Sequence, residues 1–131
     1  MTFSTLQVAE AAQVTLRQLQ WWDEKSLICP AHEKHSRIYD TNDFFKTLLV
    51  ARMRSKGLSL QRVRACLKSL PLENLQKNPE AVLLIRRKGM RICSEEAAVR
   101  AMDLENGPTW VICVAPLIEV LRSHLRKKAL Q

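Results

Sequence analysis

The sequence has no apolar run long enough to cross a membrane. Its longest run, "WVICVAPLI" at 110–118, has nine residues and includes a proline, whereas a spanning helix needs about 20. The first twelve residues lack the basic and apolar segments of a signal peptide. The four cysteines form no CxxC pair, which favours reduced thiols rather than a disulfide framework. We therefore expect a cytoplasmic protein that makes no contact with a membrane.

Glycine and histidine are scarce, with three of each in 131 residues. No glycine-rich phosphate loop can be assembled from them. The sequence also offers no paired carboxylates and no nucleophile beside a base, which are the arrangements that general acid–base and covalent catalysis require. We expect neither an enzyme nor a bound cofactor.

Acidic residues are outnumbered, with 13 Asp and Glu against 21 Lys and Arg and a net charge of +8. The surplus is spread over the chain, with five positive charges in residues 1–70 and three in residues 71–131. Such a balance favours a polyanionic partner, above all a nucleic acid. It is also compatible with an ordinary basic protein.

Two capping patterns predict two short helices near the N-terminus. In "STLQ" Ser4 precedes Gln7 by three residues, and in "TLRQ" Thr15 precedes Gln18 in the same way. A Ser or Thr followed three residues later by Gln forms a capping box at a helix start. Two short helices joined by a tight turn have the outline of a helix-turn-helix.

The rest of residues 1–70 predicts a small wing and two more helices. Two apolar pairs, Leu27–Ile28 and Ile38–Tyr39, flank a polar loop, so we expect a hairpin there. A third helix should start near Thr41 and stop at Gly57. A fourth should be capped by Ser59, with one apolar stripe. That stripe consists of Leu60, Val63, Leu67 and Leu70.

Prolines 71 and 79 interrupt any long helix, so residues 71–80 are expected to be a linker. Beyond it the pattern predicts two strands around a Lys88–Gly89 turn, a helix from Ser94 to Asn106–Gly107, a strand and a final helix. The predicted fold class is α+β: a winged helix-turn-helix with four helices over residues 1–70, then a small ββαβα domain over residues 81–131.

Two adjacent tryptophans lie on the second predicted helix. Neighbouring residues of a helix point about 100° apart, so Trp21 and Trp22 cannot both face one core. A helical wheel places Trp22 with Leu19 and Asp23 on one side, and Trp21 with Arg17 on the other. We predict that Trp22 is buried and that Trp21 is exposed, where it meets either a nucleic acid or another protein surface.

Residues 3–70 resemble the winged-helix DNA-binding domain of the MerR family of bacterial transcription regulators. The resemblance rests on "LQVAEAAQVTLRQLQWWDEKSLICPA", "RIYD" and "KGLSLQRVRACL" in this order and spacing. The matching positions are Val8, Ala9, Val14, Leu19, Trp21, Trp22, Asp23, Leu27, Pro30, Arg37, Tyr39, Gly57, Ser59 and Leu60. Gln13 and Ser26 stand where the family has glycine, and Gln20 stands where it has a phosphate-binding arginine. The prolines replace the family's long dimerising helix.

The resemblance implies that the second helix enters the major groove of double-stranded DNA and that the wing lies along the backbone. Arg17, Gln18 and Trp21 are expected nearest the DNA, Lys34 and Arg37 on the backbone, and Tyr39 at the base of the wing. The full expected set of DNA-binding residues is Thr15, Arg17, Gln18, Gln20, Trp21, Lys34, His35, Arg37 and Tyr39.

Such regulators read paired half-sites, so we expect a homodimer. The second domain would form the dimer or receive a signal from an effector or another protein. Its strands "VLLI" and "WVICV" have more apolar positions than so small a domain can bury. The alternative function is an adaptor or antitoxin-like protein that acts mainly by binding another protein through this second domain.

The segment "CPAHEKH" holds three residues of the types that bind zinc, namely Cys29, His32 and His35. A zinc site needs a fourth ligand, and no second cluster of ligands supplies one, so we predict no metal site. The remaining cysteines, at positions 66, 93 and 113, fall on apolar faces. We predict that all three are small core residues.

Overall fold

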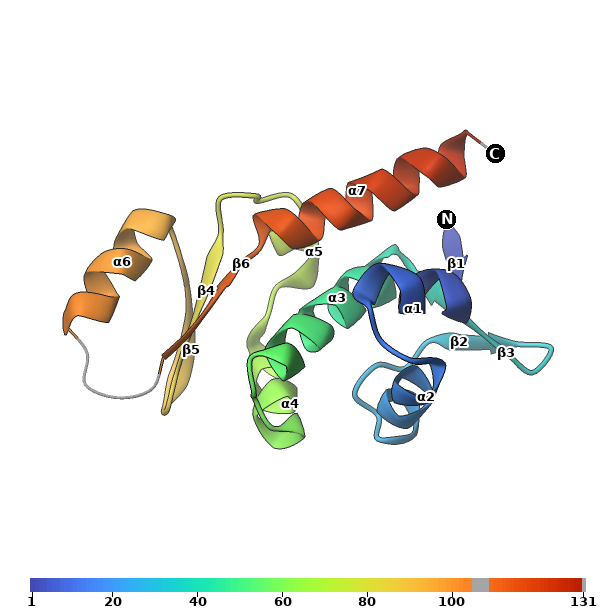
Figure 1. Ribbon diagram of the computed structural model, residues 1–131, viewed down its shortest axis with the longest axis horizontal. Helices are drawn as coiled ribbons and strands as arrows, with labels where there is room; N and C mark the ends of the chain where they lie inside the picture. The colour runs from blue at the N-terminus through green and yellow to red at the C-terminus, as the bar shows by residue number, and fades with distance from the viewer. Residues whose placement is uncertain (105–108, 131) are drawn as a thin grey trace.

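The computed structural model describes residues 1–104 and 109–130, in which helices surround two small antiparallel sheets (Figure 1). The predicted α+β class is confirmed. The first elements are β1 (Thr2–Ser4), α1 (Thr5–Ala12), α2 (Leu16–Glu24), β2 (Ala31–Glu33), β3 (Ser36–Asp40), α3 (Thr41–Ser55) and α4 (Leu60–Ser69). They are followed by α5 (Leu72–Gln76), β4 (Val82–Arg86), β5 (Gly89–Cys93), α6 (Glu95–Leu104), β6 (Thr109–Cys113) and α7 (Ala115–Ala129). No described helix is long and apolar enough for a membrane span.

The helix starts follow the predicted caps. In both predicted capping boxes the backbone N–H of the first residue donates to the Gln side chain at 2.8 Å, and the Gln backbone N–H donates back to the Ser or Thr hydroxyl. For α3 the cap is Asp40 rather than Thr41, with Asp43 completing the box. Burial, together with the nearby Asp40 carboxylate, raises the pKa of Asp43.

Two turns use left-handed backbone without glycine. Gln13 ends α1 and Ser26 follows α2, and both have φ of +57°. These are the two positions at which the MerR-like pattern has glycine. A residue with a Cβ atom adopts this conformation at a cost of roughly 1–2 kcal/mol, so both turns lower the stability of the chain relative to glycine at the same positions.

The wing differs from the sequence prediction in its first strand. Leu27 and Ile28 are not a strand, because their backbone N–H groups both donate to the Trp22 carbonyl and their side chains fill the core. The wing is instead formed by β2, after Pro30, and β3. A third strand, β1, pairs antiparallel with the other side of β3, and the sequence pattern did not predict it.

The second sheet has the order β5-β4-β6 and is antiparallel throughout. Leu83 and Ile85 of the central strand face the main core, while Val82 and Leu84 face α6, where Ala98 is buried. Figure 1 shows α6 on one side of this sheet and the remaining helices on the other. The predicted ββαβα order is therefore present. The predicted Asn106–Gly107 helix end lies outside the described residues.

The two parts of the chain share one core. The stretch 71–80, expected to be a linker, contains α5, and its Leu75 is buried against α3. The final helix, α7, also packs along α3. From β6, the indole Nε1 of Trp110 donates to the carbonyl of Lys56 at the end of α3, over 3.0 Å. These contacts hold the second sheet directly against the helix-turn-helix.

The buried tryptophan should be essential for stability. Trp22 is only 2% exposed, and truncating a large buried aromatic costs about 3–5 kcal/mol. We expect Trp22→Ala to lower the free energy of unfolding by this amount in a denaturant titration. Trp21→Ala, at the neighbouring and 39% exposed position, is the matched control and should change it by less than about 1 kcal/mol. Equal losses would contradict the assigned orientation of α2.

Candidate nucleic-acid interface

The outer face of α2 carries most of the residues predicted to meet DNA. Arg17, Gln18 and Gln20 are exposed, and Trp21 is exposed as predicted. Trp21 lines a shallow hollow of about 430 Å³ on this face. The hollow is bordered by Leu16, Arg17, Gln20 and Glu24. Leu19 and Trp22, buried on the opposite side of the helix, fix which way this face points.

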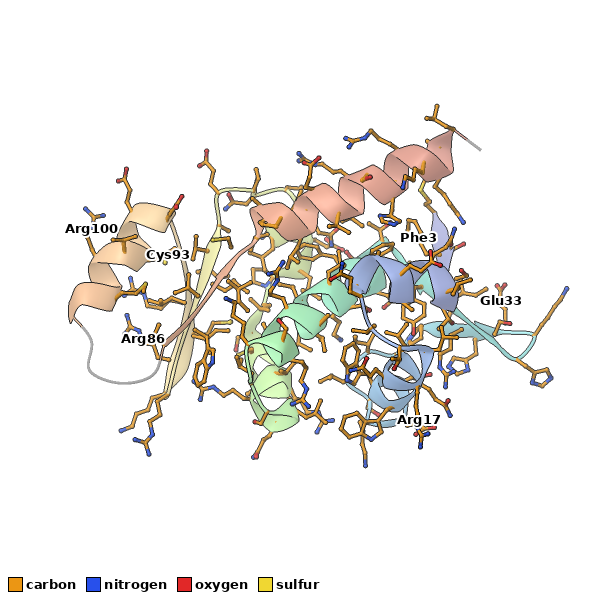
Figure 2. All side chains as sticks on the ribbon, viewed as in Figure 1. Phe3, Arg17, Glu33, Arg86, Cys93 and Arg100 are labelled. Atoms are coloured by element: carbon orange, nitrogen blue, oxygen red, sulfur yellow. The ribbon has the colours of Figure 1, made fainter. Side chains whose placement is uncertain are left out.

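Two polar side chains here, those of Gln20 on α2 and of its N-cap residue Thr15, already form hydrogen bonds within the chain. The Nε2 group of Gln20 donates to Glu24 Oε1 over 3.0 Å, one turn further on. The Thr15 hydroxyl accepts the backbone N–H of Gln18 at the start of α2. Within residues 16–24, all of which the structure describes, Arg17 is the one cation, because Gln20 stands where the MerR-like pattern has arginine. Figure 2 shows Arg17 on α2, at the lower edge of the molecule.

The wing ends in a two-residue turn formed by Lys34 and His35. Both have positive φ, +49° and +71°, which is the geometry of the tight hairpin turn that matches the twist of two strands. Glu33 pairs with Ser36 across the turn. Both turn side chains are exposed, so the wing presents a cation at its tip.

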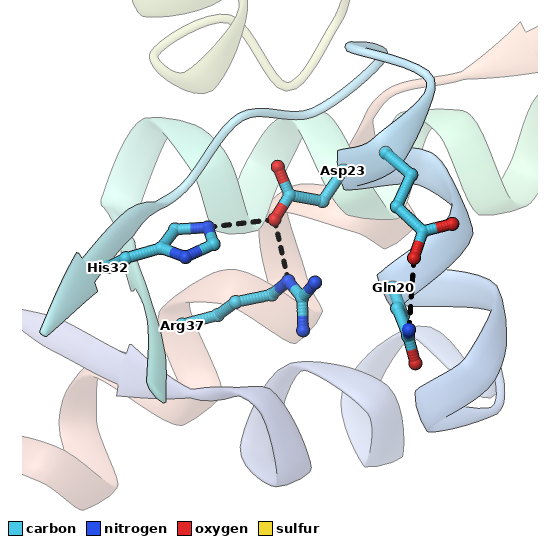
Figure 3. Close-up of polar contacts among 5 residues, drawn as sticks. Gln20, Asp23, His32 and Arg37 are labelled. Atoms are coloured by element: carbon cyan, nitrogen blue, oxygen red, sulfur yellow. Dashed lines mark hydrogen bonds and ion pairs between the residues drawn. The ribbon is translucent and has the colours of Figure 1, made fainter. Parts of the chain in front are cut away.

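A polar cluster joins α2 to the wing (Figure 3). The Nε of Arg37, on β3, donates to Asp23 Oδ2 over 2.6 Å, and His32 Nε2 on β2 lies 2.9 Å from the same oxygen. The Asp23 and Arg37 side chains are only 15% and 26% exposed, so screening by solvent is reduced. This contact fixes the angle between the wing and α2. It uses Nε alone and leaves the two Nη groups of Arg37 for another partner.

Sequence reasoning missed this cluster. The helical wheel assigned Asp23 to the core side of α2, and Arg37 was considered only as a DNA contact. Two features of the matched motif could have indicated the pair. Asp23 directly follows the two tryptophans, and Arg37 stands two residues before Tyr39. A pairing between residues 14 positions apart depends on how the wing folds back, and local patterns do not contain that information.

One residue of the predicted set of DNA contacts, Tyr39, is buried in the structure. Its side chain is 1% exposed, because Tyr39 pairs with Phe3 across β1 and β3 and belongs to the core. Burial raises its pKa to about 12, so the phenol stays neutral near pH 7. The ring supports the base of the wing, and its buried position removes it from the surface that could meet DNA.

Cys29, His32 and His35, the residues considered as zinc ligands, are all exposed. His32 contacts Asp23, and His35 is at the tip of the wing. In residues 1–104 and 109–130, no group of three or more His, Cys, Asp or Glu side chains could hold a metal ion.

The prediction for the other cysteines was only partly right. Cys66 is buried, and burial raises the pKa of its thiol. Cys93 is half-buried and Cys113 is exposed. The register places both opposite Val82, on the face that α6 covers only in part.

A helix-turn-helix with a two-stranded wing beside its second helix defines a winged-helix DNA-binding protein. The family model described as MerR HTH family regulatory protein matches residues 3–70, and the chain belongs to this family. It is therefore a DNA-binding transcription regulator. No curated protein matches the sequence significantly.

Breaking the polar cluster should destabilise the wing. Asp23→Ala removes the acceptor of a charged hydrogen bond and leaves Arg37 half-buried without its partner. We expect the free energy of unfolding to fall by about 1–3 kcal/mol, measured by chemical denaturation. Glu24→Ala, the adjacent control, breaks only an exposed pair one turn apart and should cost less than about 0.5 kcal/mol. Equal effects would mean that the cluster does not hold the wing.

Proposed function

We propose that this protein is a sequence-specific regulator that binds double-stranded DNA as a homodimer in the bacterial cytoplasm. It acts by binding and carries out no catalytic reaction. In this proposal α2 enters the major groove, with Arg17, Gln18 and Trp21 nearest the base pairs. Lys34, His35 and Arg37 of the wing follow the adjacent backbone.

The observation that carries this proposal is the exposed Arg17–Trp21 face of α2. An arginine can bind a phosphate or the edge of a guanine, and an indole N–H can donate to a phosphate. The face is fixed from behind by Leu19 and Trp22 and from the side by the Asp23–Arg37 pair. Such preorganisation lowers the cost of ordering the side chains when DNA binds.

Exposed apolar side chains on α6 support the dimer. Val99 and Met102 are 55% and 50% exposed and lie three residues apart, so they share one face of the helix. In the part of the chain that the structure describes, α4 does not continue into the family's long dimerising helix, because it ends at Ser69 and Pro71 follows. A second copy of the chain packed on this face of α6 would cover both side chains.

The proposal is tested by selecting DNA fragments from a random pool with the purified chain. A homodimer should enrich an inverted repeat, because the symmetry of the site mirrors that of the protein. Sedimentation at micromolar concentration should give twice the monomer mass. A monomer that enriches a single half-site would contradict the dimer. No enrichment at all would contradict sequence-specific binding and favour the adaptor alternative.

Trp21 should matter for DNA binding and not for folding. We expect Trp21→Ala to weaken binding to the selected site by about 1–2 kcal/mol, the value of one hydrogen bond to a charged group, and to leave the melting curve nearly unchanged. The titration is compared with Ile92→Ala, which truncates an apolar residue of β5 that is 40% exposed and should leave the DNA affinity unchanged. Unchanged affinity in Trp21→Ala would remove the indole from the interface.

A further inference from the structure

We propose that the turn between β4 and β5 is a second DNA-contacting element, which binds backbone phosphates beyond the stretch covered by α2 and the wing. The contacting side chains are those of Arg87 and Lys88. This inference rests on the proposed DNA binding and extends it to a part of the chain outside the matched family region, which ends at residue 70.

The first argument is where the positive charge lies. Residues 44–72 contain seven Lys or Arg and no Asp or Glu, and residues 81–94 contain four and none. The remaining residues carry more acidic than basic side chains, so these two segments account for the entire positive surplus of the chain. These segments contain α3 from its fourth residue onward, α4 and the β4–β5 hairpin.

The second argument is that α4 connects the hairpin to the end of the DNA-facing helix. The guanidinium of Arg64 donates to the backbone carbonyl of Lys25, the C-cap residue of α2. Two residues earlier on α4, the guanidinium of Arg62 donates to the backbone carbonyl of Arg87 in the hairpin turn. In Figure 1 α2, α4 and the β4–β5 turn all lie along the lower edge, while α7 lies along the opposite edge.

The third argument is that the turn is held in place while its own side chains are free to reach outward. Arg62 is partly enclosed by the turn and lines a hollow of about 390 Å³ together with Ser69 and Lys88. The sheet behind the turn is anchored by the Trp110–Lys56 hydrogen bond and by Ile85 in the core. The side chains of Arg87 and Lys88 are exposed.

A polyanion that tracks from α2 past α4 to the hairpin meets cations along its whole path. The DNA backbone has this shape, with one phosphate for every base step on each strand. Since phosphate contacts carry no sequence information, the hairpin adds affinity and orientation and leaves the reading of bases to α2. Arg62 is the positioning residue of the turn, because its guanidinium is bonded to the turn's backbone.

The test is the salt dependence of binding to a long mixed-sequence duplex. Each lost phosphate contact lowers the slope of log affinity against log salt by about 0.9. The full-length double variant Arg87→Gln/Lys88→Gln should therefore lose about 1.8 from the slope for each protomer bound and keep the wild-type melting curve. Arg62→Gln, which frees the turn, should lower the slope by a smaller amount with both contact side chains still present.

The matched control removes the same charge from the opposite edge. Arg122 and Lys127 are exposed on α7, and Arg122→Gln/Lys127→Gln should leave the slope unchanged. Equal losses in both double variants would overturn the proposal in favour of a general charge effect, and an unchanged slope in the hairpin variant would overturn it directly. Failure of the underlying DNA-binding proposal is distinguishable, because the wild-type chain would then not bind the duplex at all.

Discussion

The burial of α3 determines how the other helices and strands are arranged around it. Seven of its fifteen side chains are buried, and helices α1, α4, α5 and α7 and strands β1 and β3 all contact it. Each fully buried aliphatic or aromatic side chain contributes about 1.5–3 kcal/mol, so this helix alone supplies a large part of the favourable free energy of folding. Because the winged helix packs on α3 and the second sheet is hydrogen-bonded to the end of the same helix through Trp110 and Lys56, neither part can shift without disturbing the other.

Features that depend on near neighbours in the chain could be predicted from the sequence. The two capping boxes, the end of α3 shortly before Gly57, and the opposite orientations of Trp21 and Trp22 all follow from spacings of one to four residues. The resemblance to the family added the expected DNA-facing set. The order of elements after Pro79 followed from the change between helical and strand periodicity.

What escaped prediction depends on contacts that helical and strand periodicity do not show. The three-residue strand β1 is too short to give a pattern, and it exists because β3 pairs with it. Leu27 and Ile28 look like a strand in sequence but fold back on the Trp22 carbonyl. The exposure of Cys113 depends on how much of the sheet α6 covers, and the amphipathic pattern of the strand alone does not determine that.

The packing of α7 against the N-terminal elements links the order of synthesis to the order of folding. Lys128 Nζ lies 3.4 Å from the Oε1 of Gln7 and 5.6 Å from the centre of the Phe3 ring, so the first strand is completed by a helix made more than a hundred residues later. Contacts this distant in sequence require the closure of a long loop, which slows folding. A nascent chain that stops before α7 lacks the buried side chains of Leu117, Ile118 and Leu121 and leaves the apolar surface that they cover on α3 exposed to water.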